Sequence, residues 1–502
     1  MKIALLPLDE RPVNTRYPRM IADIAGVDLV LPPSDLLSAL RTPALSMHLA
    51  AWLQAQADTC DVLIVSIEML GYGGLVGSRI GHETTSEILA RLAVLREIKT
   101  QYPTLPLCGF NVITRISNAD DNIEEPYYWD RYGMRLYRYS QLMHRQQQGQ
   151  DVAKELNELE DTLPSEHIID FTRRRLRNHI INLHVLELLA DGVFDLLVLS
   201  SDDTSEYGLG SQEKAWLTTW TQRLPHLESR LLMYPGADEV GNVLLMRSLN
   251  AVFPVSSFYV HYAVDEDRSI IAPYEDSSIQ LTVERQIRAL GGVQIDDPQA
   301  ADFIVAVNTP SRIRTEYNPE HPEFASEQGR RAPFLRDFVD QVDQWLDEGR
   351  RLILADVAYP NGSDPDLIAL LLKQINLNQL AAYGAWNTAG NTIGTALAQG
   401  AASLHIRTET QRQAQQRFLL HRFLEDWGYQ QVVRQQVRDW LLTSAGEAEP
   451  KSETEAGTRA MIARELSALM PQLGGLAQEW QLGAVRLPWQ RTFEIDFDLV
   501  KV

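Results

Sequence analysis

Short apolar runs recur along the chain, each followed by a polar loop and then by a segment with helical spacing of its apolar residues. The run Leu196–Leu199 is apolar at every position, which is typical of a strand buried on both faces of a parallel sheet. This βα alternation predicts parallel sheets covered by helices. We expect strands at residues 2–8, 28–31, 61–67, 106–113, 195–200 and 230–234, then at 257–262, 292–296, 302–308, 351–356 and 379–385.

Amphipathic segments between these runs predict helices at residues 85–98, 135–160, 165–191, 211–224, 281–290, 332–347 and 366–372. Eleven candidate strands are too many for a single eight-stranded barrel. We therefore expect an α/β protein in three parts. Residues 1–252 form a TIM-barrel-like or doubly wound parallel sheet, residues 253–400 a second, Rossmann-like α/β unit, and residues 401–502 a mostly helical region. A polar linker is expected near 445–458, and the alternating tail at 492–500 predicts an edge strand.

Composition narrows the classes of partner. The chain of 502 residues is 45% hydrophobic and has a formal charge of −21, from 67 acidic and 46 basic residues. With no Lys/Arg cluster, it lacks the basic face that a nucleic acid would require. No run of 18 apolar residues predicts a membrane span, and Pro7 and Asp9 come too early for a secretory signal, so we expect a cytoplasmic protein. Cys60 and Cys108 lack metal-like spacing and are expected to be buried thiols.

Polar residues gather where seven of the candidate strands end. In open α/β sheets and barrels, ligands bind outside the carboxyl ends of the strands. One such loop would mean little, since Asp and Asn also cap helices and form turns, but several indicate a shared pocket. We predict that the substrate is bound by Asp9, Arg11, Asn14, Glu68, Tyr72, Arg79, Asn111, Arg115, Tyr234, Asp238, Glu239, Asp356, Asn361, Tyr383, Trp386, Asn387 and Asn391.

The pair Asp202 and Asp203, directly after the apolar run at 195–200, is the strongest catalytic candidate. Two like charges in one site do not ionise together easily, so one carboxyl group acts as an acid while the other stays a base. Adjacent residues of an extended segment point to opposite sides, so the two need not share a proton. The alternative is that either residue caps a helix starting near Ser205 or Ser211.

Other motifs allow two interpretations each. Asp238 and Glu239 bind sugar hydroxyls or a cation, or they begin the helix at 243–250. Trp386 stacks on a sugar or packs in the core. Arg11 binds an anionic group or forms a structural ion pair with Asp9. The segment 124–129 is a lid lined with aromatic rings, or an acidic helix start followed by buried rings.

Several kinds of site are disfavoured. The 11 histidines include no His-Glu-x-x-His motif, so zinc is not expected, and Gly71–Gly74 lacks the lysine of a phosphate loop. No Gly-x-Ser-x-Gly elbow supports a serine nucleophile. We expect no cofactor and no metal, although an oxygen-only magnesium or calcium site stays open, with the candidate ligands Asp202, Asp203, Asp238 and Asp356.

Five motifs together resemble a bacterial family of unknown function. They are Asp9-x-Arg-Pro-Val-Asn14, the stretch 69–79, Ser201-Asp-Asp203, Tyr234-Pro-Gly-Ala-Asp-Glu239 and the stretch 384–391. The strand ending in Asp-Asp also resembles the catalytic pair of retaining hexosaminidases of the O-GlcNAcase type, although its surroundings differ. That resemblance implies that Asp202 orients the substrate's acetamido group and that Asp203 protonates the leaving oxygen and then activates water, with Tyr234, Trp386 and Asn387 lining the sugar pocket.

The sequence thus favours a hydrolase acting on a small-molecule carbohydrate, a glycosidase with acid/base chemistry from Asp202 and Asp203. Two alternatives stay open. One is a non-catalytic binding or sensor protein that holds a polar small molecule, and the other is a divalent-metal-dependent hydrolase or lyase that uses the same acids. We expect no nucleic acid and no membrane as partners.

Overall fold

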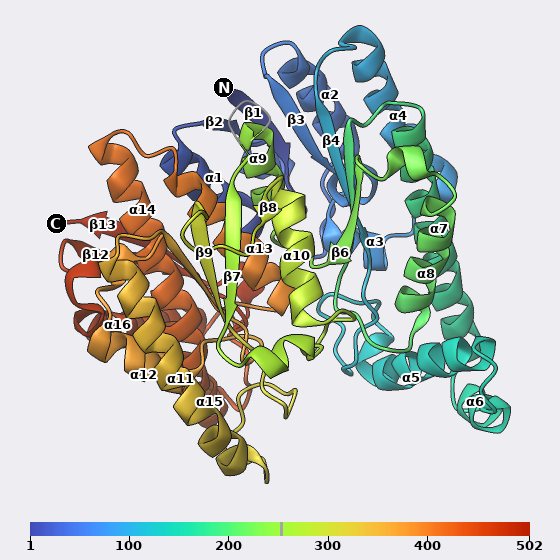
Figure 1. Cartoon of the computed structure of the whole chain (residues 1–502). Coiled ribbons are helices and arrows are strands. Elements are labelled where there is room, and N and C mark those ends of the chain that lie inside the picture. Colours follow the sequence, from blue (N-terminus) through green and yellow to red (C-terminus); the bar gives the residue numbers. More distant parts are fainter. Residues whose placement is uncertain (251–254) are drawn as a thin grey trace. The chain divides into compact units, whose positions relative to one another are not determined.

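Two parallel β-sheets organise the chain in the computed structural model, which describes residues 1–250 and 255–502 (Figure 1). Contacts between residues divide the chain into two units. Unit 1 comprises Met1–Glu10, Asp28–Leu245 and Tyr274–Asp276, and unit 2 comprises Arg11–Val27, Met246–Pro273 and Ser277–Val502. The predicted boundary between residues 252 and 253 lies outside the described residues.

The sheet of unit 1 has the strand order β2-β1-β3-β4-β5-β6, with every neighbouring pair parallel. Its strands are β1 (Lys2–Leu6), β2 (Asp28–Val30), β3 (Val62–Ser66), β4 (Leu107–Ile113), β5 (Leu196–Ser201) and β6 (Leu231–Pro235). Every residue of β3, β4 and β5 is buried, as the continuous apolar runs predicted. The sheet is open, with edges at β2 and β6, so the doubly wound alternative is confirmed and no barrel forms.

Helices of unit 1 follow the expected alternation. They are α2 (Ser46–Ala57), α3 (Leu75–Ile80), α4 (Thr85–Gln101), α5 (Trp129–Gln147), α6 (Ala153–Glu160), α7 (Ser165–Ala190), α8 (Leu209–Thr221) and the first part of α9 (Val240–Asn250), whose residues from Met246 on belong to unit 2. Apolar side chains of α2, α4, α7 and α8 form one core with the sheet, and Figure 1 shows α4 and α7 beside β3 and β4. The single helix predicted at 135–160 is two helices, because Gly149 ends α5 in a left-handed conformation.

The sheet of unit 2 has the order β11-β10-β9-β7-β8, so it repeats the doubly wound order of the first five strands of unit 1. Its strands are β7 (Ser257–Tyr262), β8 (Val293–Gln294), β9 (Phe303–Asn308), β10 (Leu352–Asp356) and β11 (Ala382–Gly384). Its helices are α1 (Pro12–Ala25), α10 (Ile279–Leu290), α11 (Phe324–Asp347), α12 (Pro365–Gln374) and α13 (Ala389–Ser403). Each of the five strands predicted at 257–385 is present.

The C-terminal part of unit 2 is mostly helical, as expected, and comprises α14 (Glu409–Arg422), a π-helical segment (Phe423–Val433), α15 (Arg434–Ala445) and α16 (Glu455–Leu469). The polar stretch at 445–458 comprises the last residue of α15, the connection between α15 and α16 and also the first four residues of α16. The predicted strand in the tail is β13 (Asp496–Lys501), which pairs antiparallel with β12 (Trp480–Arg486), a strand that the sequence pattern did not indicate. In the described part of the chain, no helix is both long and apolar enough to cross a membrane.

Substitution of Gly109 in β4 can test how closely the sheet of unit 1 is packed. A Cβ atom on Gly109 of β4 would lie 2.6 Å from the nearest ring carbon of Phe194. We expect Gly109→Ala to lower the free energy of unfolding by about 1–3 kcal/mol, because the ring must move within a close-packed core.

The matched control is Gly329→Ala in α11, where a new Cβ would meet nothing within 4 Å. That change should stabilise the protein by about 1 kcal/mol, because alanine is the better helix former. Urea denaturation of both variants measures the two effects. Equal stabilities of Gly109→Ala and the wild type would contradict the close packing at Phe194.

Candidate active site at the carboxyl ends of β3, β4 and β5

Three neighbouring strands of unit 1 carry the candidate catalytic residues to one edge of the sheet. Since β3, β4 and β5 are parallel neighbours, their carboxyl ends lie together. Arg79 lies on α3, which follows β3, Arg115 follows β4, and Asp202 and Asp203 follow β5. The adjacency of the strands therefore assembles residues that are more than 120 positions apart, such as Arg79 and Asp202.

Arg79 is the centre of this cluster. Its guanidinium Nη2 donates to Asp202 Oδ2 at 2.5 Å, and its Nη1 donates to Glu124 Oε2 at 2.6 Å. The Glu125 carboxylate lies 3.9 Å away. Only 3% of the Arg79 side chain is exposed, so these carboxylates neutralise a charge that has almost no water around it.

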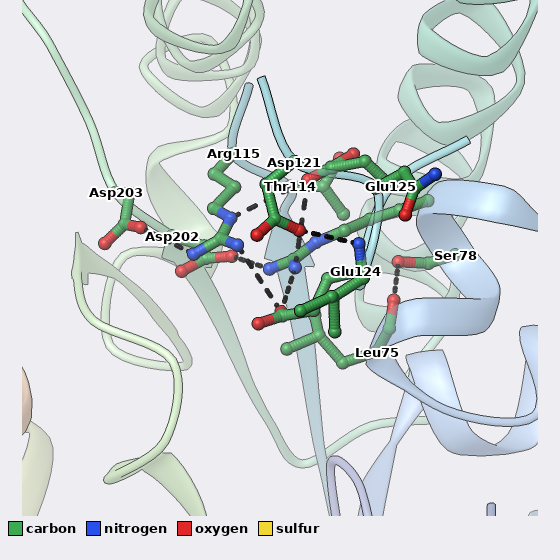
Figure 2. A network of polar contacts seen from close by, with 12 residues as sticks. Leu75, Ser78, Thr114, Arg115, Asp121, Glu124, Glu125, Asp202 and Asp203 are labelled. Carbon is green, nitrogen blue, oxygen red and sulfur yellow. Dashed lines mark hydrogen bonds and ion pairs between the residues drawn. The ribbon is translucent and has the colours of Figure 1, made fainter. Parts of the chain in front are cut away.

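Arg115 forms the second half of the cluster (Figure 2). Its Nη1 donates to Asp203 Oδ2 at 3.0 Å, and its Nη2 lies 3.4 Å from Glu124. Its Nε lies 3.7 Å from the Glu125 carboxylate. Arg79 and Arg115 thus share Glu124 and Glu125, while each contacts one member of the Asp202–Asp203 pair.

Four carboxylates face two guanidinium groups here, so full ionisation would leave two negative charges in excess. Burial and, after it, the neighbouring charge of Asp202 raise the pKa of Asp203 to about 6, although Arg115 and Arg79 oppose the shift. Burial likewise raises the pKa of Glu125 to about 7, although Arg79 and Arg115 oppose the shift. The cluster therefore holds exchangeable protons close to neutral pH.

The backbone of Asp203 is strained, with φ of 35°, in a region that residues other than glycine rarely adopt. Hydrogen bonds hold the chain on both sides of it. The Asp202 amide donates to the Ile113 carbonyl at 3.2 Å, and the Thr204 amide donates to the Tyr274 carbonyl at 2.8 Å. The N-cap of α8 is Gly208, so the alternative that Asp202 or Asp203 caps this helix is wrong.

A cavity of about 20 Å³ adjoins the pair, between Arg115, Tyr137, Ser140, Asp203 and Ser205. This volume suits one water molecule rather than a sugar ring. Within the described residues, several buried polar atoms of the region have no hydrogen-bond partner, namely Arg79 Nε, Arg115 Nε, Glu125 Oε1 and the hydroxyl groups of Ser200 and Ser201. Such atoms are usually paired with water or a ligand.

Glu68 and Asn111, both predicted to bind the substrate, are hydrogen-bonded to each other. Glu68 Oε1 accepts from Asn111 Nδ2 at 2.5 Å and from the Val112 amide at 2.7 Å, and Oε2 accepts from Ser66 Oγ at 3.3 Å. Burial raises the pKa of Glu68 to about 7. This acid therefore ties the end of β3 to β4. Gly71–Gly74 forms no phosphate loop, because Gly71 and Tyr72 belong to a π-helical turn.

The other candidates of unit 1 lie on other strands. Asp9 follows β1, and Tyr234, Asp238 and Glu239 lie in or after β6; all four are buried. Three strands separate β1 from β6, so the ends of these two strands are about 19 Å apart at the usual strand spacing. Glu239 directly precedes α9, and a Cβ atom on Gly236 would lie 2.3 Å from its carboxylate. The start of α9 nevertheless returns to β1, because a Cβ atom on Gly241 would lie 3.5 Å from the Leu5 side chain.

In unit 2, Asp356 lies at the end of β10. Its carboxylate accepts from Asn308 Nδ2 at 2.8 Å and from the Asp364 amide at 2.6 Å. Burial, together with the charge of Asp364, raises its pKa to about 7. Arg331 lies 3.5 Å from the Asp364 carboxylate. This group holds the loop after β10.

The remaining candidates of unit 2 have mixed surroundings. Tyr383 stacks on Phe423 at 4.0 Å and shares a hydrogen bond with Ser363, and the buried Trp386 packs beside Phe493 at 6.1 Å. Arg11 lies over the Trp489 ring at 4.6 Å and 3.8 Å from Glu494. The Asn361 amide donates to the Asn387 carbonyl at 3.0 Å, and both residues have positive φ. Two further candidates are buried in helices, Asn14 in α1 and Asn391 in α13.

Sequence reasoning did not assign Glu124 and Glu125 to the site. Their position in a long connection between β4 and α5 gave no periodic signal, and the segment 124–129 allowed a lid or a helix start. The helix begins at Trp129, whose ring is buried, while Tyr127 is 74% exposed. One indication was available in the sequence. Arg79 and Arg115 both follow predicted strands, and arginines that become buried there need acidic partners.

Loss of the central guanidinium should leave Asp202 and Glu124 with uncompensated buried charge. We expect Arg79→Met to lower the free energy of unfolding by about 3–5 kcal/mol, as for other broken buried ion pairs. The control is Arg96→Met, because the Arg96–Asp191 pair is more than 40% exposed on both sides and should contribute less than about 1 kcal/mol. Urea denaturation compares them, and equal losses would show that Arg79 is not the electrostatic centre.

Among the described residues, no group of three or more His, Cys, Asp or Glu side chains is placed to hold a metal ion. Comparison with known proteins found no match among curated proteins and none among solved structures. A family model described as "Protein of unknown function (DUF4127)" matches residues 3–498. This match covers nearly the whole chain, and the protein therefore belongs to the DUF4127 family.

Proposed function

We propose that the protein is a hydrolase acting on glycosides, with Asp202 and Asp203 as its catalytic carboxyl groups. One observation carries the proposal: two adjacent carboxyl groups at the end of β5 have different electrostatic partners. Asp202 is paired with the buried Arg79 at 2.5 Å, whereas the pKa of Asp203 is raised to about 6. Surroundings that give two neighbouring carboxyl groups different tendencies to hold a proton are typical of acid/base pairs in enzymes.

Asp203 is the proton donor in this proposal. A pKa of about 6 leaves part of the group protonated near neutral pH, and an acid of this strength transfers its proton efficiently there. It protonates the glycosidic oxygen as the bond from that oxygen to the anomeric carbon breaks. The resulting carboxylate then takes a proton from the water that attacks the anomeric carbon, which restores the acid. The neighbouring cavity of about 20 Å³ has room for such a water molecule.

Asp202 is the charge-stabilising partner. Arg79 holds one of its oxygens, which fixes the orientation of the side chain. A carboxylate beside the sugar stabilises the positive charge of an oxocarbenium-like transition state. The resemblance of Ser201-Asp-Asp203 to the O-GlcNAcase type supports an N-acetylated sugar as the substrate, whose acetamido group Asp202 would orient.

The proposal includes a cytoplasmic location and a small-molecule carbohydrate as the partner. Cys60 and Cys108 are both thiols, as is usual for a protein of a reducing compartment.

The activity test uses aryl glycosides, including aryl N-acetylglucosaminide. We expect Asp203→Asn to lower kcat about 10²- to 10⁴-fold, the usual contribution of a general acid. For the wild type, kcat should fall as the pH rises above about 6, because the acid form of Asp203 is lost. An aryl glycoside with a good leaving group needs less protonation of its glycosidic oxygen. Its kcat should therefore fall less, both in Asp203→Asn and as the pH rises.

The matched control is Asp195→Asn at the other end of the same strand. Asp195 accepts from the Leu107 amide and from Lys99, both at 2.8 Å, and lies away from the acid pair. It should leave kcat unchanged. Equal turnover by Asp203→Asn and the wild type would overturn the role of Asp203. Binding of a glycoside without any turnover by the wild type would instead indicate a binding protein.

A further inference from the structure

A larger cavity of unit 1, of about 790 Å³, lies beside α3 and the segment that precedes α5. Its volume falls within the range of about 300–1,000 Å³ that is usual for small-molecule sites. Aromatic and polar side chains line it together, among them Tyr72, Tyr127, Tyr128, His82, His167, Asp170, Arg41 and Arg174.

Tyr127 is the feature of this cavity that packing does not explain. Its side chain is 74% exposed, which is more than the partial burial usual for tyrosine. Arg41 lies over one face of the ring at 4.2 Å. Arg41 also donates to the carbonyl groups of Asn122 and Glu125, which anchors it to the same segment. The ring is therefore held in place from one side while it stays exposed to solvent.

Other residues of the lining are also held by contacts with one another. The Tyr128 ring stacks on His167 with centroids 4.3 Å apart, and its hydroxyl donates to Asp170 at 2.7 Å. Arg174 donates to both oxygens of Asp170 and lies 3.4 Å from His82. Flat rings alternate here with carboxylate, guanidinium and imidazole groups. This combination suits a ligand that has apolar faces and hydroxyl groups at its edges, as a sugar has.

Two segments of chain connect this cavity to the acid cluster. Glu124 and Glu125 contact Arg79 and Arg115, while the next residues along the chain, 126–128, line the cavity. Likewise Arg79 of α3 belongs to the cluster, while Ile80 and Gly81 line the cavity. The small cavity beside Asp203 holds no sugar ring, so most of the contact with a substrate must come from elsewhere.

We propose that this cavity is a subsite for the non-reacting sugars of an oligosaccharide, with Tyr127 as its stacking platform. The inference rests on the proposed glycosidase function and specifies its substrate class as an oligosaccharide rather than a single glycoside. Binding energy gained on remote sugars then lowers the barrier at the reacting bond, so longer substrates gain in kcat/KM.

The test compares the tetramer of N-acetylglucosamine with aryl N-acetylglucosaminide, and adds tetramers of glucose and xylose as alternative probes. Loss of one aromatic stacking contact corresponds to about a three- to tenfold loss of affinity. We expect Tyr127→Ala to weaken binding of one tetramer, measured by calorimetry on the Asp203→Asn background, by this factor. With Asp203 intact, Tyr127→Ala should lower turnover of that tetramer more than turnover of the aryl monosaccharide. Tyr127→Phe keeps the ring and should bind as the wild type does.

Trp220→Ala is the control for loss of an exposed aromatic ring, because Trp220 is 59% exposed on α8 and does not line the cavity. The inference is overturned if no tetramer binds, or if Tyr127→Ala binds the tetramers as the wild type does. Tetramer binding that depends on Tyr127, without turnover of any glycoside, would leave the subsite in place and overturn the glycosidase function. Turnover of a tetramer that does not depend on Tyr127 would overturn the subsite and leave the glycosidase function in place.

Discussion

The buried guanidinium group of Arg79 is the interaction on which the candidate site depends. A charge that is 3% exposed must be neutralised within the protein, and the nearest acids come from two other segments, the connection after β4 and the end of β5. Arg79 thereby joins α3, Glu124 and Asp202 in one network. Its contact with Asp202 also makes the two acids of the pair unequal, because Asp203 lies against the more exposed Arg115.

The two units have the same order of their first five strands and similar polar contacts at the carboxyl edges of their sheets. Both sheets have the doubly wound order, and in both an acid and an amide from neighbouring strands bind each other at the carboxyl edge. These pairs are Glu68 with Asn111 in unit 1 and Asp356 with Asn308 in unit 2. Each acid also accepts a backbone N–H group, and burial raises the pKa of each to about 7. Some polar residues at strand ends therefore hold neighbouring strands together, whereas others are candidates for catalysis.

This difference between scaffold and chemistry explains which predicted site residues the structure brings together. Arg79, Arg115, Asp202 and Asp203 form one cluster because β3, β4 and β5 are neighbours. Asp9 and Asp238 follow strands near opposite ends of the same sheet, and the start of α9, at Gly241, returns to Leu5 of β1. Tyr383 is stacked on Phe423 inside the core of unit 2. The sequence pattern does not reveal which strands are neighbours in the sheet, because every strand has the same apolar signature.

The sequence by itself determined the class of the fold, because continuous apolar runs alternating with helical periodicity fit only strands buried on both faces and helices that cover them. It located eleven parallel strands and singled out Asp202 and Asp203. The order of the strands, the break between α5 and α6 and the pairing of β12 with β13 depend on long-range packing, which local periodicity does not encode. The roles of Glu124 and Glu125 were decided only by the tertiary structure, because a buried arginine selects its partners by distance in space.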